Sequence, residues 1–407
     1  MSNENCVIIG GSHAGAQLAA ALRQSGWTGN ITIVSADPCT PYHRPPLSKA
    51  YLDGSTPLDK IQIRPAPFYD KQNIDLILST TVTAIDREQQ QLTLDNGDTL
   101  PYSKLAITTG AKVRKISIPG SDLKGVHYLR DLADVDNIKT FVAKGKSAVI
   151  IGGGYIGLET AASLRKAGMT VTVLEAAPRI LQRVTTEQIS AFYSRIHTEE
   201  GVNIIVDAAV QSIDGDEHTE SVSCADGSTI PADLVIIGIG VIPETELAEA
   251  AGLAVGNGII VDEFARTSDH NIVAAGDCTF HHNPIYDTHL RLESVQNATD
   301  QAKVAAKTLC GTLETYSALP WFWSDQYDLK LQIAGLSQGF DEVVIRGTTE
   351  TGRSFAAFYF KEGKLLAVDA INRPKEFMQT KRALTAGQTA SPEQLADESI
   401  ELKDIFA

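Results

Sequence analysis

An apolar run near the start of the chain ends in a glycine-rich turn whose residue types suit dinucleotide binding. The run Val7–Ile9 leads into Gly10, Gly11 and Ser12, and a helix-forming stretch, 14–23, follows at once. This order predicts a strand, a tight turn and a helix, the usual start of a βαβ nucleotide-binding unit. The free N–H groups and the positive dipole end of such a helix bind a pyrophosphate.

The same pattern recurs further along the chain. Another apolar run, 148–151, is followed by Gly152, Gly154 and Gly157, which satisfy the complete G-x-G-x-x-G spacing. The first copy departs from that spacing at Ser12. Because each copy can hold one pyrophosphate, the chain is predicted to bind two dinucleotides.

An acid after the second strand of each unit is expected to bind a ribose. In the second unit Glu175 closes the strand 171–174, where its carboxylate would accept both ribose hydroxyls and repel a 2′-phosphate. This favours NADH over NADPH, with nearby Arg183 as an adenosine or phosphate contact. The alternative is a simple strand-end charge. In the first unit the candidate is Asp37, which could equally be a turn aspartate.

Two features near the first turn allow more than one interpretation. His13 could touch the pyrophosphate, or could cap or pack locally. The proline-rich segment Pro41–Lys49 could be an exposed linker. It also follows the second strand of the nucleotide fold, where ligands approach, and its Arg44 and Lys49 could reach an anion.

A larger repeat supports two copies of one architecture. A predicted meander over 81–99 contains the hairpin turn Asn96-Gly97 and leads to a strand over 105–108 and Gly110. The same order returns from 222 to 240, at a constant offset of 130 residues. A further strand, 272–275, ends in Gly276-Asp277 before a helix over 296–309. An aspartate placed there can hold a flavin ribityl hydroxyl.

Composition excludes several classes of function. The chain has 407 residues and a formal net charge of −15, which argues against nucleic acid as its main partner. Its five cysteines form no close pair, which disfavours a metal site, a disulfide framework or a dithiol centre. Neither a membrane span nor a targeting segment is recognisable, and we expect a cytoplasmic protein.

Several segments together resemble a known family. They are the two glycine-rich turns, Pro-Pro-Leu-Ser-Lys-Ala-Tyr at 45–51, Pro-Trp-Phe-Trp-Ser-Asp-Gln-Tyr at 320–327 and the segment 372–377. Across essentially its whole length the chain resembles the FAD-dependent, NADH-using ferredoxin reductases of the glutathione-reductase structural class. The resemblance implies an α/β fold with two Rossmann-like domains and a C-terminal α+β domain. The expected boundaries are 1–112 with 242–318 (FAD), 113–241 (NAD) and 319–407.

The resemblance also implies cofactor contacts, with a departure at Ala36, where the family's ribose acid is missing. The residues expected to bind FAD are Gly10, Ser12, His13, Ala14, Gly15, Ala36, Asp37, Arg44, Lys49, Val82, Thr109, Gly110, Arg130, Gly276, Asp277, Val295 and Trp323. Those expected on the nicotinamide side are Gly152, Gly154, Tyr155, Ile156, Gly157, Glu159, Glu175, Arg183, Gly240 and Glu293.

The activity implied is electron transfer from NADH through FAD to a small [2Fe-2S] ferredoxin that supplies a cytochrome P-450 monooxygenase or a ring-hydroxylating dioxygenase. A flavin converts the two-electron donor to one-electron steps. Lys49 and Glu159 would form a charge pair near the flavin, although Glu159 could instead complement a helix dipole. Trp323 would lie beside the isoalloxazine, or could be a core aromatic.

Two rival functions fit the same fold. A single-cysteine NADH oxidase or peroxidase would use Cys39, the only cysteine near the first flavin loop. A flavin-bearing redox signalling protein of the apoptosis-inducing-factor type would show slow reduction by NADH and a long-lived charge-transfer complex.

Overall fold

The first apolar run forms the central strand of a parallel sheet in the computed structural model, which describes residues 4–406. Val7 and Ile8 are fully buried, because both faces of the sheet are covered. Every pairing in this sheet is parallel. In spatial order its strands are β20 (Ile272–Ala274), β7 (Lys104–Ile107), β1 (Asn5–Ile9), β2 (Asn30–Val34) and β3 (Ile74–Ile77).

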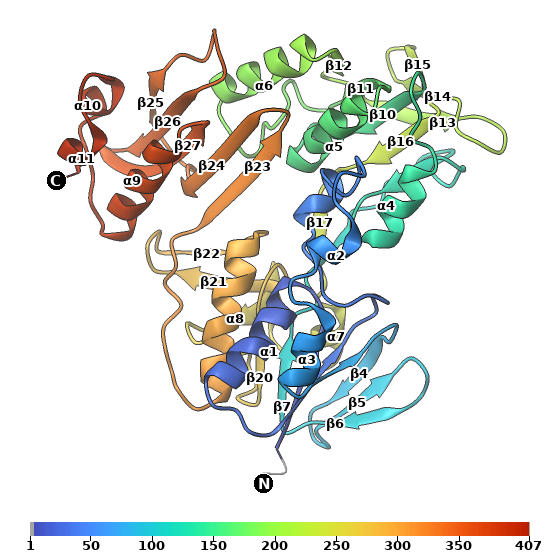
Figure 1. Ribbon diagram of the computed structural model, residues 1–407, viewed down its shortest axis with the longest axis vertical. Helices are drawn as coiled ribbons and strands as arrows, with labels where there is room; N and C mark the ends of the chain where they lie inside the picture. Colours follow the sequence, from blue (N-terminus) through green and yellow to red (C-terminus); the bar gives the residue numbers. More distant parts are fainter. Residues whose placement is uncertain (1–3, 407) are drawn as a thin grey trace. The chain divides into compact units, whose positions relative to one another are not determined.

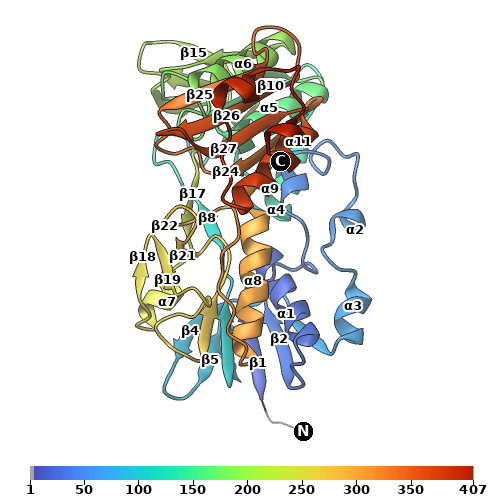
Figure 2. The same ribbon diagram turned by 90° about the vertical axis from the view of Figure 1, so that its left-hand side faces the viewer.

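Two alanine-rich helices cover one face of this sheet. Helices α1 (His13–Gln24) and α8 (Val295–Leu309) lie side by side in both views (Figures 1 and 2). Ala19, Ala302 and Ala305 are fully buried in the core cluster that the helices share with the sheet. Their short side chains let the helices approach closely, and both predicted helices are confirmed. Shorter helices nearby are α2 (Leu58–Ile61), α3 (Ala66–Lys71) and α7 (Glu246–Ala250).

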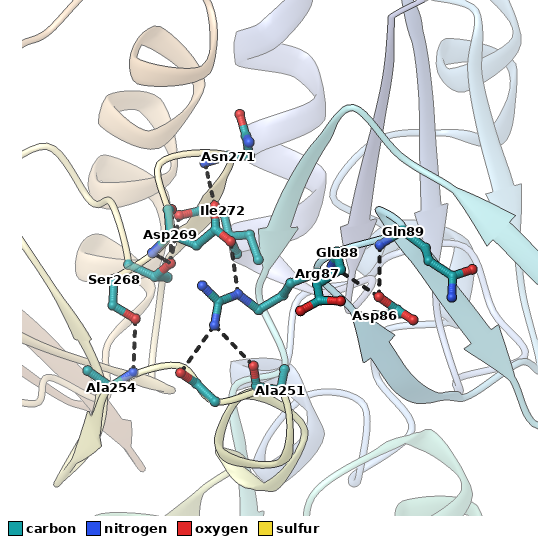
Figure 3. A network of polar contacts seen from close by, with 12 residues as sticks. Asp86, Arg87, Glu88, Gln89, Ala251, Ala254, Ser268, Asp269, Asn271 and Ile272 are labelled. Atoms are coloured by element: carbon teal, nitrogen blue, oxygen red, sulfur yellow. Dashed lines mark hydrogen bonds and ion pairs between the residues drawn. The ribbon is translucent and has the colours of Figure 1, made fainter.

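The other face packs against the predicted meander. Its strands are β4 (Val82–Asp86), β5 (Gln91–Leu94) and β6 (Thr99–Pro101), which pair antiparallel. Arg87, directly after β4, anchors the meander (Figure 3). Its Nε donates to Asp269 Oδ2 at 2.9 Å, and Nη1 donates to the carbonyl of Ala251 at 3.3 Å. The guanidinium therefore joins the meander to α7 and to the loop before β20.

The strands near the first parallel sheet that have not yet been described form two small sheets. One sheet has the order β18 (Val255–Gly256), β19 (Gly258–Val261), β21 (Thr279–Asn283) and β22 (Thr288–Leu290). Two further strands, β8 (Ala111–Val113) and β17 (Val241–Pro243), pair with each other.

The second glycine-rich turn belongs to another parallel sheet, so the prediction of two Rossmann-like units is confirmed. Its order is β12 (Val202–Ile205), β11 (Thr170–Leu174), β10 (Ser147–Ile151), β16 (Leu234–Ile237) and β9 (Val126–Tyr128). Its meander is β13 (Val210–Asp214), β14 (Ser221–Cys224) and β15 (Thr229–Pro231), which confirms the internal repeat. Its helices are α4 (Leu132–Lys139), α5 (Tyr155–Lys166) and α6 (Glu187–Glu199).

The C-terminal residues form an antiparallel sheet with an aromatic core. Phe355, Phe358 and Phe360 are fully buried, and Phe355 meets Phe192 of α6 with ring centroids 4.9 Å apart. The strand order is β23 (Trp321–Gln326), β24 (Leu329–Gly335), β27 (Lys364–Ile371), β26 (Phe355–Lys361) and β25 (Glu342–Gly347). The helices are α9 (Pro374–Thr385), α10 (Pro392–Ala396) and α11 (Leu402–Ile405).

Contacts divide the described chain into two compact units. Unit 1 runs to His43, from Leu58 to Lys112 and from Ile242 to Phe322, and holds the first sheet. Unit 2 holds the second parallel sheet, the C-terminal sheet and the segment 44–57, whose 3₁₀ turn η1 (Pro45–Ser48) packs on α5.

Candidate functional site

The first glycine-rich turn in unit 1 leaves no room for side chains. Gly10 has φ +107°, and a Cβ there would lie 2.3 Å from the Thr108 carbonyl oxygen. A Cβ on Gly15 would lie 2.0 Å from the Gly10 carbonyl oxygen. The N-cap Ser12 makes no side-chain cap, and the first turn of α1 carries no acid. A helix N-terminus at a narrow glycine turn fits a dinucleotide pyrophosphate such as that of FAD.

His13 begins α1 and faces another histidine. Its Nε2 lies 3.1 Å from His43 Nδ1, and the His13 side chain is buried. Burial lowers the pKa of His43, with a smaller contribution from nearby Arg64. This contact supports a local packing role for His13, and its contact with a pyrophosphate stays a prediction.

The predicted ribose acid of the first unit is engaged in a local turn. Asp37 Oδ2 accepts from Tyr42 Oη at 2.5 Å, and Oδ1 accepts from the backbone N–H of Cys39 at 3.2 Å. Ala36 beside it is exposed. These bonds favour the turn interpretation of Asp37, and its ribose contact stays a prediction.

Other predicted FAD contacts in unit 1 lie at strand ends and helix starts. Gly276 follows β20 by two residues, and a Cβ on it would lie 3.3 Å from the Ala14 Cβ of α1, so the structure brings these two residues together. Asp277 follows Gly276, and Val295 begins α8. Four more predicted residues lie elsewhere in unit 1. Val82 begins β4, and Thr109 and Gly110 follow β7. Glu293, which is predicted on the nicotinamide side, pairs with Arg291.

The second turn, in unit 2, has the same narrow geometry and an open side. A Cβ on Gly157 would lie 2.2 Å from the Gly152 carbonyl oxygen, whereas a Cβ on Gly154 would meet nothing within 4 Å. Tyr155 and Ile156 begin α5, and Ile156 is 47% exposed although it is apolar. The space beside Gly154 and the uncapped helix end fit a second dinucleotide.

Glu175 is held in place by the backbone of this turn. Its Oε2 accepts from the Gly153 N–H at 2.8 Å, and Oε1 accepts from the Ala177 N–H at 2.8 Å. Arg183 lies close to Gly240, whose added Cβ would be 3.8 Å from Arg183 Nη2. The structure therefore brings Glu175 to the glycine turn, as expected for a ribose acid.

The predicted charge pair is present and buried in unit 2. Lys49 Nζ lies 2.6 Å from Glu159 Oε2, and Glu159 is 5% exposed. Glu159 also accepts hydrogen bonds from Ser48 Oγ at 2.6 Å and Ser324 Oγ at 2.7 Å. A buried carboxylate requires such partners, and helix-dipole complementation alone does not account for this position.

The segment that carries Lys49 is not an exposed linker. Tyr42, Leu47 and Ser48 are buried, so the interpretation of this segment as an exposed linker is wrong. Arg44 Nη1 donates to the Arg130 carbonyl at 2.5 Å, so two further predicted FAD contacts lie together in unit 2. Trp323 lies half-buried on β23.

A cavity of about 430 Å³ in unit 2 borders the charge pair. Its lining residues come from the η1 segment, α5, the end of α6 and β23. They are Lys49, Ala50, Asp53, Ser55, Glu159, Ala162, Ser163, Arg165, Lys166, Glu200, Asp325, Gln326 and Tyr327.

Sequence reasoning missed the polar groups behind Glu159. These are Ser48, Ser324, Gln326 and His197, which come from three distant stretches of sequence. A weak signal existed, since Ser324 and Gln326 are two residues apart and would share one face if this segment formed a strand. Nothing local indicated that the face meets Glu159.

Residues 4–406 contain neither a metal-type side-chain cluster nor a helix suited to cross a membrane. No cluster of three or more His, Cys, Asp or Glu side chains is arranged to hold a metal ion. No helix in this range combines the length and apolarity needed to cross a membrane. None of the five cysteines, which all lie in this range, forms a disulfide bond.

Comparison with known proteins identifies the family. The pyridine nucleotide-disulphide oxidoreductase model matches residues 4–302, and the reductase C-terminal model matches 321–406. Putidaredoxin reductase from Pseudomonas putida is 44% identical over 100% of this chain and 97% of its own length. Rhodocoxin reductase from Rhodococcus erythropolis is 43% identical over 98% and 93%.

Solved structures agree with this assignment. The covalent putidaredoxin reductase–putidaredoxin complex matches with a TM-score of 0.97 and 44% identity, covering 100% of this chain and 98% of that one. The ferredoxin reductase for the CYP199A2 system from Rhodopseudomonas palustris matches with a TM-score of 0.96 and 42% identity over all of both chains. The chain therefore belongs to the pyridine nucleotide-disulphide oxidoreductase family.

Proposed function

We propose that this protein is an NADH-dependent ferredoxin reductase, which moves electrons from NADH through tightly bound, non-covalent FAD to a small [2Fe-2S] ferredoxin. The observation that carries the proposal is the presence of two dinucleotide-type turns in one chain. Each turn directly follows the central strand of a parallel sheet. The names of the relatives, which include putidaredoxin, rhodocoxin and ferredoxin reductases, supply the acceptor class.

FAD suits a donor and an acceptor that transfer different numbers of electrons in each step. NADH gives two electrons as a hydride, whereas an iron–sulfur cluster accepts one electron at a time. Bound FAD supplies the conversion between these two kinds of step. The protein's task is to bind both dinucleotides, to orient them and to place charge where it develops.

The proposed residues divide by cofactor. FAD is held by the residues named above around Gly10–Gly15, Thr109-Gly110 and Gly276-Asp277, together with Arg44, Lys49, Val82, Arg130, Val295 and Trp323. NADH is held by Gly152–Gly157, Glu175, Arg183, Gly240 and Glu293. We keep the division into a discontinuous FAD domain (1–112 and 242–318), an NAD domain (113–241) and a C-terminal domain (319–407) as part of this proposal.

Three residues carry the proposed chemistry. The Lys49 ammonium offsets negative charge on the reduced flavin, and Glu159 fixes Lys49 through their 2.6 Å contact. Trp323 borders the flavin on the side of the electron acceptor. The ferredoxin in turn supplies a cytochrome P-450 or a ring-hydroxylating dioxygenase, as the relatives' names suggest for their own systems.

We place the protein in the cytoplasm. Its proposed donor is NADH, and five cysteines without a disulfide bond in residues 4–406 are typical of a reducing compartment.

The test is NADH-driven reduction of a panel of purified [2Fe-2S] ferredoxins by the FAD-loaded protein, with the Cys39→Ser variant as a matched control. We expect both proteins to reduce at least one ferredoxin at equal rates. Loss of activity in Cys39→Ser would favour the peroxidase alternative. Slow flavin reduction with a persistent charge-transfer band would favour the signalling alternative.

A further inference from the structure

A line of hydrogen bonds runs through unit 2 from Glu159 to Tyr327. Ser324 Oγ donates to Glu159 Oε1 at 2.7 Å, and Gln326 Nε2 donates to Ser324 Oγ at 3.2 Å. Gln326 Oε1 lies 2.8 Å from His197 Nε2, and His197 Nδ1 lies 3.1 Å from Tyr327 Oη. Glu159, Ser324, Gln326 and His197 are all at most 5% exposed. The line joins α5, β23 and α6.

The hydrogens in this line all point the same way. The Ser324 hydroxyl has one hydrogen, which it donates in its hydrogen bond to Glu159. Its other neighbour must therefore be a donor, and that donor is the Gln326 amide NH₂. The Gln326 carbonyl oxygen then accepts from His197 Nε2–H, and His197 Nδ1 accepts from Tyr327 Oη–H. Burial lowers the pKa of His197 to about 4, which keeps its ring neutral and compatible with this tautomer. Each hydrogen bond therefore runs from the Tyr327 end of the line toward the Glu159 end.

We propose that Ser324, Gln326 and His197 are positioning residues that hold Glu159 as an oriented carboxylate facing Lys49. An ionised carboxylate only accepts hydrogen bonds, and Glu159 is shielded from water. The donors around it, Ser324, Ser48 and Lys49, replace the water that it has lost. The line therefore fixes the orientation of Glu159 and, through their contact, the position of the Lys49 ammonium.

The consequence for the flavin rests on the proposed function. If Lys49 offsets charge on the reduced cofactor, a weaker hold on Glu159 destabilises the reduced state. A carboxylate without the Ser324 donor also leaves more negative charge facing the Lys49 ammonium, which weakens the positive potential that Lys49 provides. Both effects act in the same direction, toward a more negative flavin potential.

The experiment compares the midpoint potential of bound FAD in the wild type, Ser324→Ala and Thr160→Val holoproteins. We expect Ser324→Ala to shift the two-electron equilibrium about tenfold against reduction, which is about 30 mV more negative. Thr160 is the matched control, a fully buried hydroxyl on α5 that bonds to the Ile156 carbonyl of its own helix at 2.7 Å. Thr160→Val should leave the potential unchanged. Gln326→Met is a second variant, should Ser324→Ala fail to fold.

A double-mutant cycle separates positioning from general structural damage. In a Glu159→Gln background the Ser324→Ala change should no longer move the potential, because its partner charge is gone. Equal shifts in both backgrounds, or no shift in the wild-type background, would overturn the positioning role.

A flavin-independent readout distinguishes failure of this inference from failure of the proposed function. Selective ¹⁵N-histidine labelling, with His197→Gln to assign the signal, reports the His197 tautomer directly. We expect a neutral ring protonated at Nε2 at pH 6, and a ring protonated at Nδ1 would contradict the line. A protein with the expected tautomer that cannot be reduced by NADH would refute only the proposed function.

Discussion

Lys49 and Glu159 form a buried ion pair, and at the scale of single residues the proposed chemistry depends on it. The side chains of the pair are 19% and 6% exposed, so neither charge is fully solvated. Removing one member of such a pair leaves the other charge without its main partner. The effect of substitution should therefore be large, and it should differ from that of neighbouring lysines on the surface.

Lys49→Met should slow anaerobic flavin reduction by NADH about 100-fold, in line with the loss of one charge-stabilising group in other active sites. Stopped-flow loss of flavin absorbance measures this rate. The matched control is Lys166→Met, because Lys166 borders the same cavity but is 69% exposed and pairs with Asp53 at 2.8 Å. Equal rates for Lys49→Met and wild type would remove the catalytic assignment.

Glu175 should decide between the two nicotinamide nucleotides. Its carboxylate is oriented by two backbone N–H groups, and a hydrogen bond to a charged group contributes ~1.5–3 kcal/mol. Glu175→Gln should lower kcat/KM for NADH about tenfold and raise it for NADPH. Glu217→Gln, an 80% exposed acid of the same unit, is the control. An unchanged NADH-to-NADPH preference would contradict the ribose role.

At the scale of elements, the repeated strand–turn–helix units could be predicted from sequence because their signals are local. The glycine turns at Gly10 and Gly152 are encoded within a few residues, and the 130-residue offset reappears as two matching meanders. The partial burial of the Pro41–Lys49 segment could not be settled from the sequence, since its proline content is also typical of linkers. The Ser324 partner of Glu159, and Gln326 behind it, could not be predicted either, because both lie on β23, more than 160 residues away.

The contact between β27 and the nucleotide-binding part of unit 2 contains a buried carboxyl. Asp369 Oδ2 accepts from Tyr359 Oη at 2.6 Å and from Thr185 Oγ1 at 3.2 Å. Burial raises the pKa of Asp369 to about 6, and the two hydrogen bonds offset this only in part. The neutral form is therefore favoured in the folded state, and ionisation of Asp369 costs stability.

The pH dependence of stability follows from the sign of this shift. With a folded pKa near 6 and an ordinary value of 3.8, the contribution of Asp369 is greatest below pH 3.8 and is lost as pH rises to about 6. The loss is on the order of 3 kcal/mol. Melting temperatures of the FAD-saturated wild type and Asp369→Asn should therefore diverge in favour of the variant between pH 4 and 6.5. A difference that is constant with pH would contradict the shifted pKa.

At the scale of the whole molecule, the chain has two nucleotide-binding units and an added antiparallel sheet, which is more than the binding of a single dinucleotide requires. A dehydrogenase that acts on a small substrate requires one such turn, whereas this chain has two. Its family assignment and its charge pair fit electron transfer from a pyridine nucleotide to an external acceptor. A bound flavin is the link on which every step depends.

The most direct measurement is an anaerobic NADH titration of the purified, FAD-loaded protein, followed by visible absorbance, with [2Fe-2S] ferredoxin added afterwards. We predict one tightly held FAD per chain, full loss of the flavin bands with one NADH per FAD, and reduction of two ferredoxins as the bands return, because each cluster takes one electron. A protein that retains no FAD when supplied with it, or whose reduced flavin does not pass electrons to any ferredoxin, would contradict the account.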